Sequence, residues 1–312
     1  MDEKTDIIKQ IFWDYDSSLQ IKSISRPTDG YTNSVYFITF SNDCNVELVL
    51  KFLEPGNNTE VVFYRLLHQN AVDSFPVPKV LKHDSILQSY YISSKLSGLP
   101  LSQLWDSMTH KQRLETYRKL GTLVGQLHSQ FTYDKCRYLQ GQQFPSWKDM
   151  FSDRIEKQIT QFKGTMFEEL GNVIYEYLVQ NIHLIDYHIV PRLLHMDLHC
   201  ANILMINTEI TGILDAADAL IGHNEYELMR IEKGHFEETE NAEYRNEFMC
   251  SYTNYVKLDD GYEKRRRFYS LSRELVGMKC LLDYDNQYAQ SGSVEQDMKN
   301  IENKIKSIIK TN

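Results

Sequence analysis

Short runs of β-branched and aromatic residues dominate the hydrophobic pattern in the first hundred residues. Such runs, bounded by clusters of polar residues, are typical of β-strands. The polar stretch at 41–45 has the composition of a hairpin turn, whereas 58–70 repeats its apolar positions at helical spacing. The pattern therefore predicts short strands within 20–53, notably at 35–40 and 46–52, a helix at 58–70, and strands near 79–81 and 88–94.

Helical periodicity replaces this pattern after about residue 96. Residues 110–129 place Leu114, Leu120 and Leu127 on one apolar stripe of a helix. The same periodicity predicts helices at 147–163, at 166–188 and from Glu225 to the end of the chain, with short strands between them at 203–206 and 210–214. Strands first and helices later predict an α+β fold class, and a ligand is expected in a cleft between a β-rich and a helical lobe.

The composition is that of a folded protein. Of 312 residues, 42% are hydrophobic and 25% are charged, which excludes a disordered or collagen-like chain. There is no apolar run of about 18 residues and no signal-peptide pattern, so no membrane association is expected. The five cysteines form no C-x-x-C pair, which favours reduced thiols and a cytoplasmic location.

Negative charge is concentrated in one part of the sequence. The net charge is −9, and no basic stripe that would indicate nucleic-acid binding is present. Between Glu209 and Glu247 there are eleven acidic residues against three basic ones. This segment is either a solvated helix face or an acidic wall that attracts a cationic substrate.

The stretch LLHMDLHCANILMINTEITGILD carries the clearest chemistry. It places Asp197 two residues after His195, Asn202 five residues later, and Asp215 at the end of an apolar run. Phosphoryl transfer needs a carboxylate that orients the acceptor hydroxyl, together with oxygen ligands that hold Mg²⁺ against the phosphates. The spacing from Asn202 to Asp215 allows a strand out and a strand back, which would bring these two side chains close together.

Candidate nucleotide-binding residues lie upstream. Lys51 ends an apolar strand and can contact phosphates, and Glu60 follows in the next helix, where it can pair with this lysine. A polar turn that includes Gly30, Asn33 and Ser34 leads into a strand, so that its backbone can cover the phosphates.

This order of motifs resembles protein-kinase-like folds, and in detail the aminoglycoside phosphotransferase and choline kinase superfamily. The segments that carry the resemblance are HMDLHCANIL, GILDAADALIGHNEYEL, LGTLVGQLHS and YYISSKLSGLPL. The resemblance implies a bilobal fold, with an N-lobe at 1–96 built on a five-stranded antiparallel sheet and one helix, and a helical C-lobe at 97–312. The sequence departs from the family pattern at Cys200-Ala201, Ala216, His223 and Glu227.

The resemblance also implies a role for each matching residue. Asp197 would be the catalytic base or hydroxyl-orienting carboxylate, and Asn202 and Asp215 would be the Mg²⁺ ligands. Lys51 would contact the phosphates and Glu60 would position it. His195 would hold the loop through a backbone hydrogen bond, and the main chain at Ser94 and Leu96 would bind adenine.

The predicted function is the phosphorylation of a small-molecule hydroxyl with ATP or GTP and Mg²⁺. The favoured acceptor is cationic, such as an aminoglycoside antibiotic, and the alternative is a metabolic kinase for choline, homoserine, methylthioribose or another sugar. A Ser/Thr protein kinase is disfavoured because Ala216-Ala217 follow Asp215, and a nucleotide-binding scaffold without catalysis because the catalytic set is intact. The role of Asp218 stays open, and a monomer or homodimer is expected.

Overall fold

The structure is a computed structural model, and it describes residues 3–27, 35–41, 46–70, 75–86, 89–236, 242–284 and 291–310. The chain separates into two compact units. The first unit consists of Met1–Met108 and Cys200–Asp218, and the second of Thr109–His199 and Ala219–Asn312. No helix within the described ranges is both long and apolar enough to cross a membrane.

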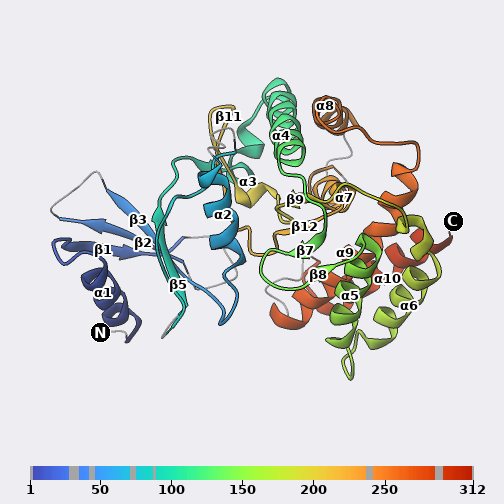
Figure 1. Cartoon of the computed structure of the whole chain (residues 1–312), viewed down its shortest axis with the longest axis horizontal. Helices are drawn as coiled ribbons and strands as arrows, with labels where there is room; N and C mark the ends of the chain where they lie inside the picture. The colour runs from blue at the N-terminus through green and yellow to red at the C-terminus, as the bar shows by residue number, and fades with distance from the viewer. Residues whose placement is uncertain are drawn as a thin grey trace. The chain divides into compact units, whose positions relative to one another are not determined.

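A five-stranded antiparallel sheet forms the centre of the first unit (Figure 1). Its order is β1-β2-β3-β5-β4, which confirms the predicted sheet. The strands are β1 (Ile21–Ser25), β2 (Val35–Phe40), β3 (Glu47–Phe52), β4 (Val80–Asp84) and β5 (Tyr90–Ser94). In β3, Leu50 is fully buried and its neighbour Lys51 points to the opposite face, because successive strand residues alternate.

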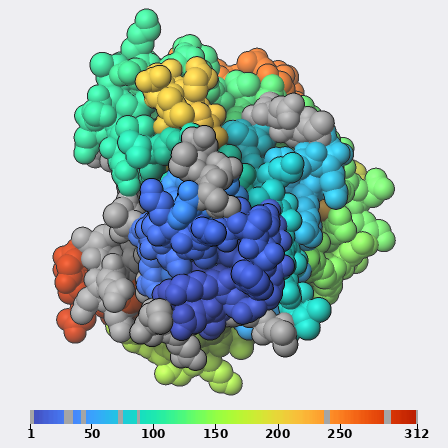
Figure 2. Space-filling view, turned by 90° about the vertical axis from the view of Figure 1, so that its left-hand side faces the viewer, coloured from blue at the N-terminus to red at the C-terminus, as the bar shows by residue number. Residues whose placement is uncertain are grey.

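Two helices pack on the two faces of this sheet. On one face, Ile8 and Phe12 of α1 (Glu3–Tyr15) are buried against alternate residues of β2 and β3, in a cluster with Ile38 and Leu50. The sequence analysis missed α1, although its apolar residues have helical spacing. The other face carries Lys51 and is covered by α2 (Thr59–Gln69), the helix predicted at 58–70. In the space-filling view, the darkest blue residues, which include α1, occupy much of the visible face (Figure 2).

A hairpin from the middle of the chain completes the first unit. Strands β10 (Ile203–Ile206) and β11 (Glu209–Ile213) pair antiparallel, and β6 (Leu99–Pro100) pairs with β10. The first unit therefore extends past the boundary at residue 96 that the sequence suggested. It also includes α3 (Leu101–Leu104) and two short 3-10 helices, η1 (Trp105–Ser107) and η3 (Cys200–Asn202).

The second unit is mainly helical, as expected. Its helices are α4 (His110–Gln130), α5 (Trp147–Thr160), α6 (Glu168–Gln180), α7 (Asn224–His235), α8 (Ala242–Tyr252), α9 (Tyr262–Tyr284) and α10 (Val294–Lys310). The helix predicted at 166–188 is shorter, because α6 ends at Gln180 and the 3-10 helix η2 (Ile182–Ile185) follows. Aromatic side chains fill the core, where the indole nitrogen of Trp147 donates a 2.7 Å hydrogen bond to the Tyr269 hydroxyl.

A small antiparallel sheet in the second unit was not expected from the sequence. Its order is β8-β7-β12-β9, and the strands are β7 (Cys136–Tyr138), β8 (Gln143–Phe144), β9 (Arg192–Leu194) and β12 (Leu220–Gly222). Strands of two or three residues are too short to show the alternation by which strands are recognised. This sheet matters for the candidate site because Leu194 and Leu220, which pair directly, come shortly before Asp197 and shortly before α7.

Helices α4 and α8 approach closely because α4 has glycines on the face that meets α8. A Cβ atom at Gly121 would lie 2.2 Å from the carbonyl oxygen of Phe248, and one at Gly125 would lie 2.8 Å from the ring of Tyr255. The first neighbour is backbone and cannot move as a side chain can, so Gly121 is needed for this contact.

We expect Gly121→Ala to destabilise the protein by about 1–3 kcal/mol, the usual cost of overpacking. Gly234→Ala in α7 is the matched control, because no atom lies within 4 Å of its Cβ position. The control should be neutral or stabilising by up to about 1 kcal/mol, since alanine favours helix more than glycine does. Urea unfolding of both variants measures the difference, and equal stabilities would contradict the proposed role of Gly121.

Candidate active site

An ion-pair cluster on the α2 face of the first unit unites three of the predicted site residues. Lys51 Nζ lies 2.7 Å from Glu60 Oε2 and 2.9 Å from Asp215 Oδ1. Burial by itself would lower the pKa of Lys51, but the charges of Glu60 and Asp215 outweigh it and raise that pKa above its ordinary value. The pairing of Lys51 with Glu60 that the sequence suggested is therefore present, and the lysine is held cationic.

Asp215 follows the β10–β11 hairpin, as expected from its spacing to Asn202. Ile203 pairs with Ile213, and Leu214 donates its N–H to the Asn202 carbonyl at 2.9 Å. Asp215 has φ +61°, a left-handed backbone conformation that is rare for residues other than glycine. The backbone that carries the two predicted metal ligands thus meets at the base of one hairpin.

The donor set at this hairpin fits Mg²⁺. Asn202 supplies an amide oxygen and Asp215 a carboxylate, the oxygen ligands that Mg²⁺ accepts in proteins alongside phosphates and water. The Asp215 side chain is about half exposed, at 47%, so that the carboxylate stays accessible although Lys51 contacts Oδ1. Within the described residues, no group of three or more His, Cys, Asp or Glu side chains is placed to hold a metal ion.

In the second unit, the backbone around Asp197 is fixed by buried side chains. The Asp197 N–H is donated to His195 Nδ1 at 3.2 Å, the backbone bond expected of this histidine. Met196 between them has φ 73°, and its N–H is donated to Glu227 of α7. Glu227 and His128 are both fully buried and pair at 2.7 Å, which ties the loop to α4 as well as to α7.

Two basic side chains lie beside the Asp197 carboxylate. Arg230 Nη2 is 3.7 Å from Oδ1, and His199 Nε2 is 3.5 Å from Oδ2. Burial would raise the pKa of Asp197, but the hydrogen bond from His199 and the charge of Arg230 outweigh it and lower that pKa. Asp197 is therefore ionised at neutral pH, and its carboxylate is suited to accept a hydrogen bond from an acceptor hydroxyl.

Helix α7 supplies most of these contacts. Glu227 and Arg230 are three residues apart and are therefore neighbours on its surface, and His235 is its last residue. His235 Nε2 donates to the carbonyl of Leu198 at 2.6 Å, while its Nδ1 lies 3.3 Å from the Tyr117 hydroxyl. The sequence analysis missed Arg230 and His235, because what distinguishes them is their burial beside the loop, which the sequence does not show.

The remaining predicted residues are distributed as follows. Gly30, Asn33 and Ser34 lie outside the described residues. Ser94 ends β5, and its N–H is donated to Lys79 O at 3.0 Å within the sheet. Leu96 packs close to Gly212 of β11. The adenine contact expected at Ser94 and Leu96 stays a prediction, and the N–H of Ser94 already has a partner.

Several of the acidic residues within 209–247 are buried and do not form an exposed negative surface. Glu225, Glu227 and Glu232 are 4%, 0% and 2% exposed. Their ionic partners are Arg265, which contacts Glu225 at 2.6 and 2.7 Å, His128 and Arg245. These three glutamates bind other parts of the second unit and cannot attract a substrate, so the acidic-wall interpretation is wrong for them. Glu237, Glu238 and Glu240 lie outside the described residues.

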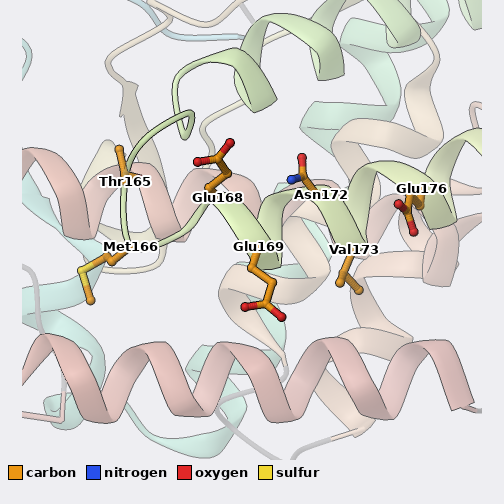
Figure 3. Close-up of a pocket in the computed structure, with 7 residues that line it drawn as sticks. All are labelled: Thr165, Met166, Glu168, Glu169, Asn172, Val173 and Glu176. Carbon is orange, nitrogen blue, oxygen red and sulfur yellow. The ribbon is translucent and has the colours of Figure 1, made fainter.

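A shallow pocket in the second unit lies along α6 (Figure 3). Its volume is about 570 Å³, and its lining includes Glu168, Glu169 and Glu176. None of its lining residues belongs to the predicted site, and they bring together no nucleophile or base–acid pair suited to phosphoryl transfer.

Comparison with known proteins gives a family and a fold. Residues 23–268 match the model of a phosphotransferase enzyme family, whereas no curated protein sequence matches the chain. Among solved structures, aminoglycoside phosphotransferase APH(4)-Ia is similar over 99% of both chains, with 18% identity and a TM-score of 0.70. A thermostable mutant of that enzyme, in a ternary complex with ADP and hygromycin B, is similar over 98% of both chains, with 16% identity and a TM-score of 0.71.

A protein from Haemophilus somnus 129PT assigned as a fructosamine-3-kinase is also similar. It matches over 96% of both chains with 18% identity and a TM-score of 0.67. At these identities the similarity concerns the fold. It confirms the α+β, protein-kinase-like fold expected from the sequence.

Two buried histidines of the second unit predict how stability depends on pH. Burial lowers the pKa of His235 to about 4 and that of His223 to about 3. In the unfolded chain both would take up a proton below pH 6.5 or so. Between about pH 6.5 and 4, unfolding therefore takes up protons, and stability falls as the pH falls, by roughly 1 kcal/mol per pH unit for each histidine.

We expect His235→Gln to reduce this pH dependence by about one proton, because glutamine can still donate to Leu198 O but does not titrate. The measurement is the free energy of unfolding of both proteins at intervals from pH 6.5 to 4.5. If the two slopes are the same, His235 is not buried in its neutral form.

Proposed function

Because this chain belongs to the phosphotransferase enzyme family, we propose that it transfers the γ-phosphoryl group of a nucleoside triphosphate to a hydroxyl of a small molecule. The observation that carries the proposal is the ion-pair cluster of Lys51, Glu60 and Asp215. A lysine held cationic between a helix carboxylate and a hairpin carboxylate can exchange the hairpin carboxylate for phosphate oxygens. Catalysis of this kind rests on positioning and charge neutralisation.

Lys51 would bind the phosphates as a fixed cation, with Glu60 keeping its amine in place. Asn202 and Asp215 would hold Mg²⁺, which when bound would neutralise charge on the phosphates. Lys51 contacts Asp215 in the structure, so that each of these charges has a counter-charge. The arriving phosphates would bring negative charge for Lys51, and the metal would bring positive charge for Asp215.

Asp197 would orient the acceptor hydroxyl and accept its proton as the bond to phosphorus forms. Its lowered pKa makes it a weak base, so orientation would be the larger part of its contribution. The contacts of Glu227 and His235 to the Met196 N–H and the Leu198 carbonyl would hold the backbone on both sides of Asp197 while it acts.

We propose an adenine nucleotide as the donor. Structures of similar fold were solved with ADP and with AMP-PNP. The main chain at Ser94 and Leu96 is the proposed adenine-binding segment. In support, the Leu96 side chain packs close to Gly212 of the β10–β11 hairpin, which leads to Asp215. A comparison of ATP with GTP at equal concentration tests this choice.

For the acceptor we propose an amine-bearing sugar, with an aminoglycoside antibiotic as the first candidate. The support is that similar folds include aminoglycoside phosphotransferases, in complexes with hygromycin B and gentamicin, and a protein assigned as a fructosamine-3-kinase. The second candidate is a metabolic kinase for a neutral sugar or alcohol. The burial of Glu225, Glu227 and Glu232 favours it, because these acids are not available to a cationic acceptor.

An acceptor screen that measures ADP release tests the proposed function. We expect ATP turnover to rise with at least one of a panel of aminoglycosides, fructosamines, choline, homoserine and methylthioribose. Asp197→Asn is the matched control, and its turnover should fall about 10²–10⁴-fold, the range expected when a positioned carboxylate that orients the hydroxyl and takes its proton is lost. Stimulation by a neutral sugar alone would replace the amine-bearing acceptor, and full turnover in Asp197→Asn would remove Asp197 from the site.

A second experiment tests the metal site by calorimetry. We expect Asp215→Ala to lose most of the gain in ATP affinity that Mg²⁺ confers, because Asp215 is the charged member of the ligand pair. Metal-free ATP should bind at least as well as before, since Lys51 no longer has Asp215 as a competing partner. Asp14→Ala, an exposed residue of α1, is the control. An unchanged effect of Mg²⁺ in Asp215→Ala would place the metal elsewhere.

A further inference from the structure

We propose that Tyr64 is a positioning residue of the phosphotransfer site, through which helix α2 holds the backbone of the metal ligand Asp215. The inference rests on the proposed function for its consequence in the reaction. Its structural part concerns the protein without any ligand and can be tested separately.

Tyr64 closes a ring of contacts in the first unit. Its hydroxyl donates to Glu60 Oε1 at 2.6 Å and accepts the N–H of Asp215 at 2.9 Å. The other oxygen of Glu60 pairs with Lys51, and Lys51 pairs with the Asp215 carboxylate. Asp215 is therefore held twice, by its side chain through Lys51 and by its backbone through Tyr64, and both connections return to Glu60.

The hydroxyl group of Tyr64 is what makes this connection. The side chain is fully buried, so water cannot replace either hydrogen bond. A tyrosine hydroxyl can donate and accept at once. Here the donor serves the carboxylate of Glu60 and the acceptor serves the amide of Asp215.

The backbone of Asp215 needs such support. Its φ of +61° is unfavourable for a residue with a side chain, and such conformations persist where the surroundings hold them. The fixed N–H sets the direction of the backbone after β11, and this direction determines the position of the Asp215 carboxylate. A displacement of α2 that separates Glu60 from Lys51 would also release this N–H, so the lysine and the metal ligand are ordered together.

Tyr91 offers a matched comparison. It lies opposite Lys51 in the sheet, is 3% exposed, and its ring meets that of Tyr64 at 6.4 Å between centroids. Its hydroxyl lies near Glu60. Tyr91→Phe therefore removes a buried hydroxyl from beside Glu60 but leaves the hydrogen bond between Tyr64 and Asp215. Tyr36→Phe is the general control, because Tyr36 lies in the cluster on the α1 face of the sheet.

The first measurement is hydrogen exchange of the Asp215 amide in the nucleotide-free protein. We expect this amide to be protected in the wild type and to exchange about tenfold faster or more in Tyr64→Phe, as the loss of one buried hydrogen bond implies. Tyr91→Phe and Tyr36→Phe should leave it unchanged. An unprotected amide in the wild type, or equal protection in Tyr64→Phe, would overturn the inference.

The second measurement is ATP affinity as a function of Mg²⁺ concentration. We expect the Mg²⁺ concentration at half-effect to rise about tenfold in Tyr64→Phe, with metal-free ATP affinity within about twofold of wild type. Tyr91→Phe should not shift the Mg²⁺ dependence. An equal shift in both variants would mean that Glu60, rather than the Asp215 amide, transmits the effect, and the inference would be wrong.

These outcomes separate the inference from the proposed function. A wild type that binds no Mg²⁺–ATP would contradict the proposed function, while its Asp215 exchange would still decide the Tyr64 connection. A wild type that binds Mg²⁺–ATP, with Tyr64→Phe indistinguishable from it in both measurements, would contradict only the inference. If Tyr64→Phe does not fold, protection of the wild-type amide supports the connection and its absence overturns it.

Discussion

A lysine charge that is mostly removed from water must be balanced by nearby carboxylates, and the first unit is arranged around this requirement. The Lys51 side chain is 14% exposed and contacts two carboxylates from different parts of the chain. Burial of an unpaired ammonium group would cost several kcal/mol or shift its pKa until it became neutral. Helix α2 must therefore present Glu60 to β3, and the β10–β11 hairpin must end beside them.

The second unit has its own buried charge, around the backbone on either side of Asp197. Glu227 and His128 are fully buried. One carboxylate oxygen of Glu227 pairs with His128, and the other accepts the N–H of Met196. Removing one partner of such a pair leaves the other charge buried without a counter-charge, and this costs more free energy than the intact pair contributes to stability. This explains how a left-handed residue such as Met196 is kept in place immediately before the proposed catalytic carboxylate.

The acidic segment illustrates why charge counted along a sequence is a weak guide to a surface. Three of its glutamates form ion pairs with Arg265, His128 and Arg245 inside the second unit. Whether a carboxylate faces solvent depends on which bases from other helices reach it, and here those bases lie 13, 40 and 99 residues away along the chain. Because these three glutamates are paired inside the second unit, any negative charge that a cationic acceptor would meet must come from other residues.

The sequence by itself determined the kind of fold and the family, and it suggested the chemistry of the candidate site. It could suggest Asp197, Asn202 and Asp215 because their spacing is a local property of one loop and one hairpin, and Lys51 and Glu60 because they lie on consecutive elements. Only the tertiary structure decided which side chains hold them. Tyr64 meets Asp215 across 151 positions of the chain, and His128 meets Glu227 across 99. Such contacts leave no periodic trace in the sequence, because they depend on how helices and strands far apart in the chain are packed together.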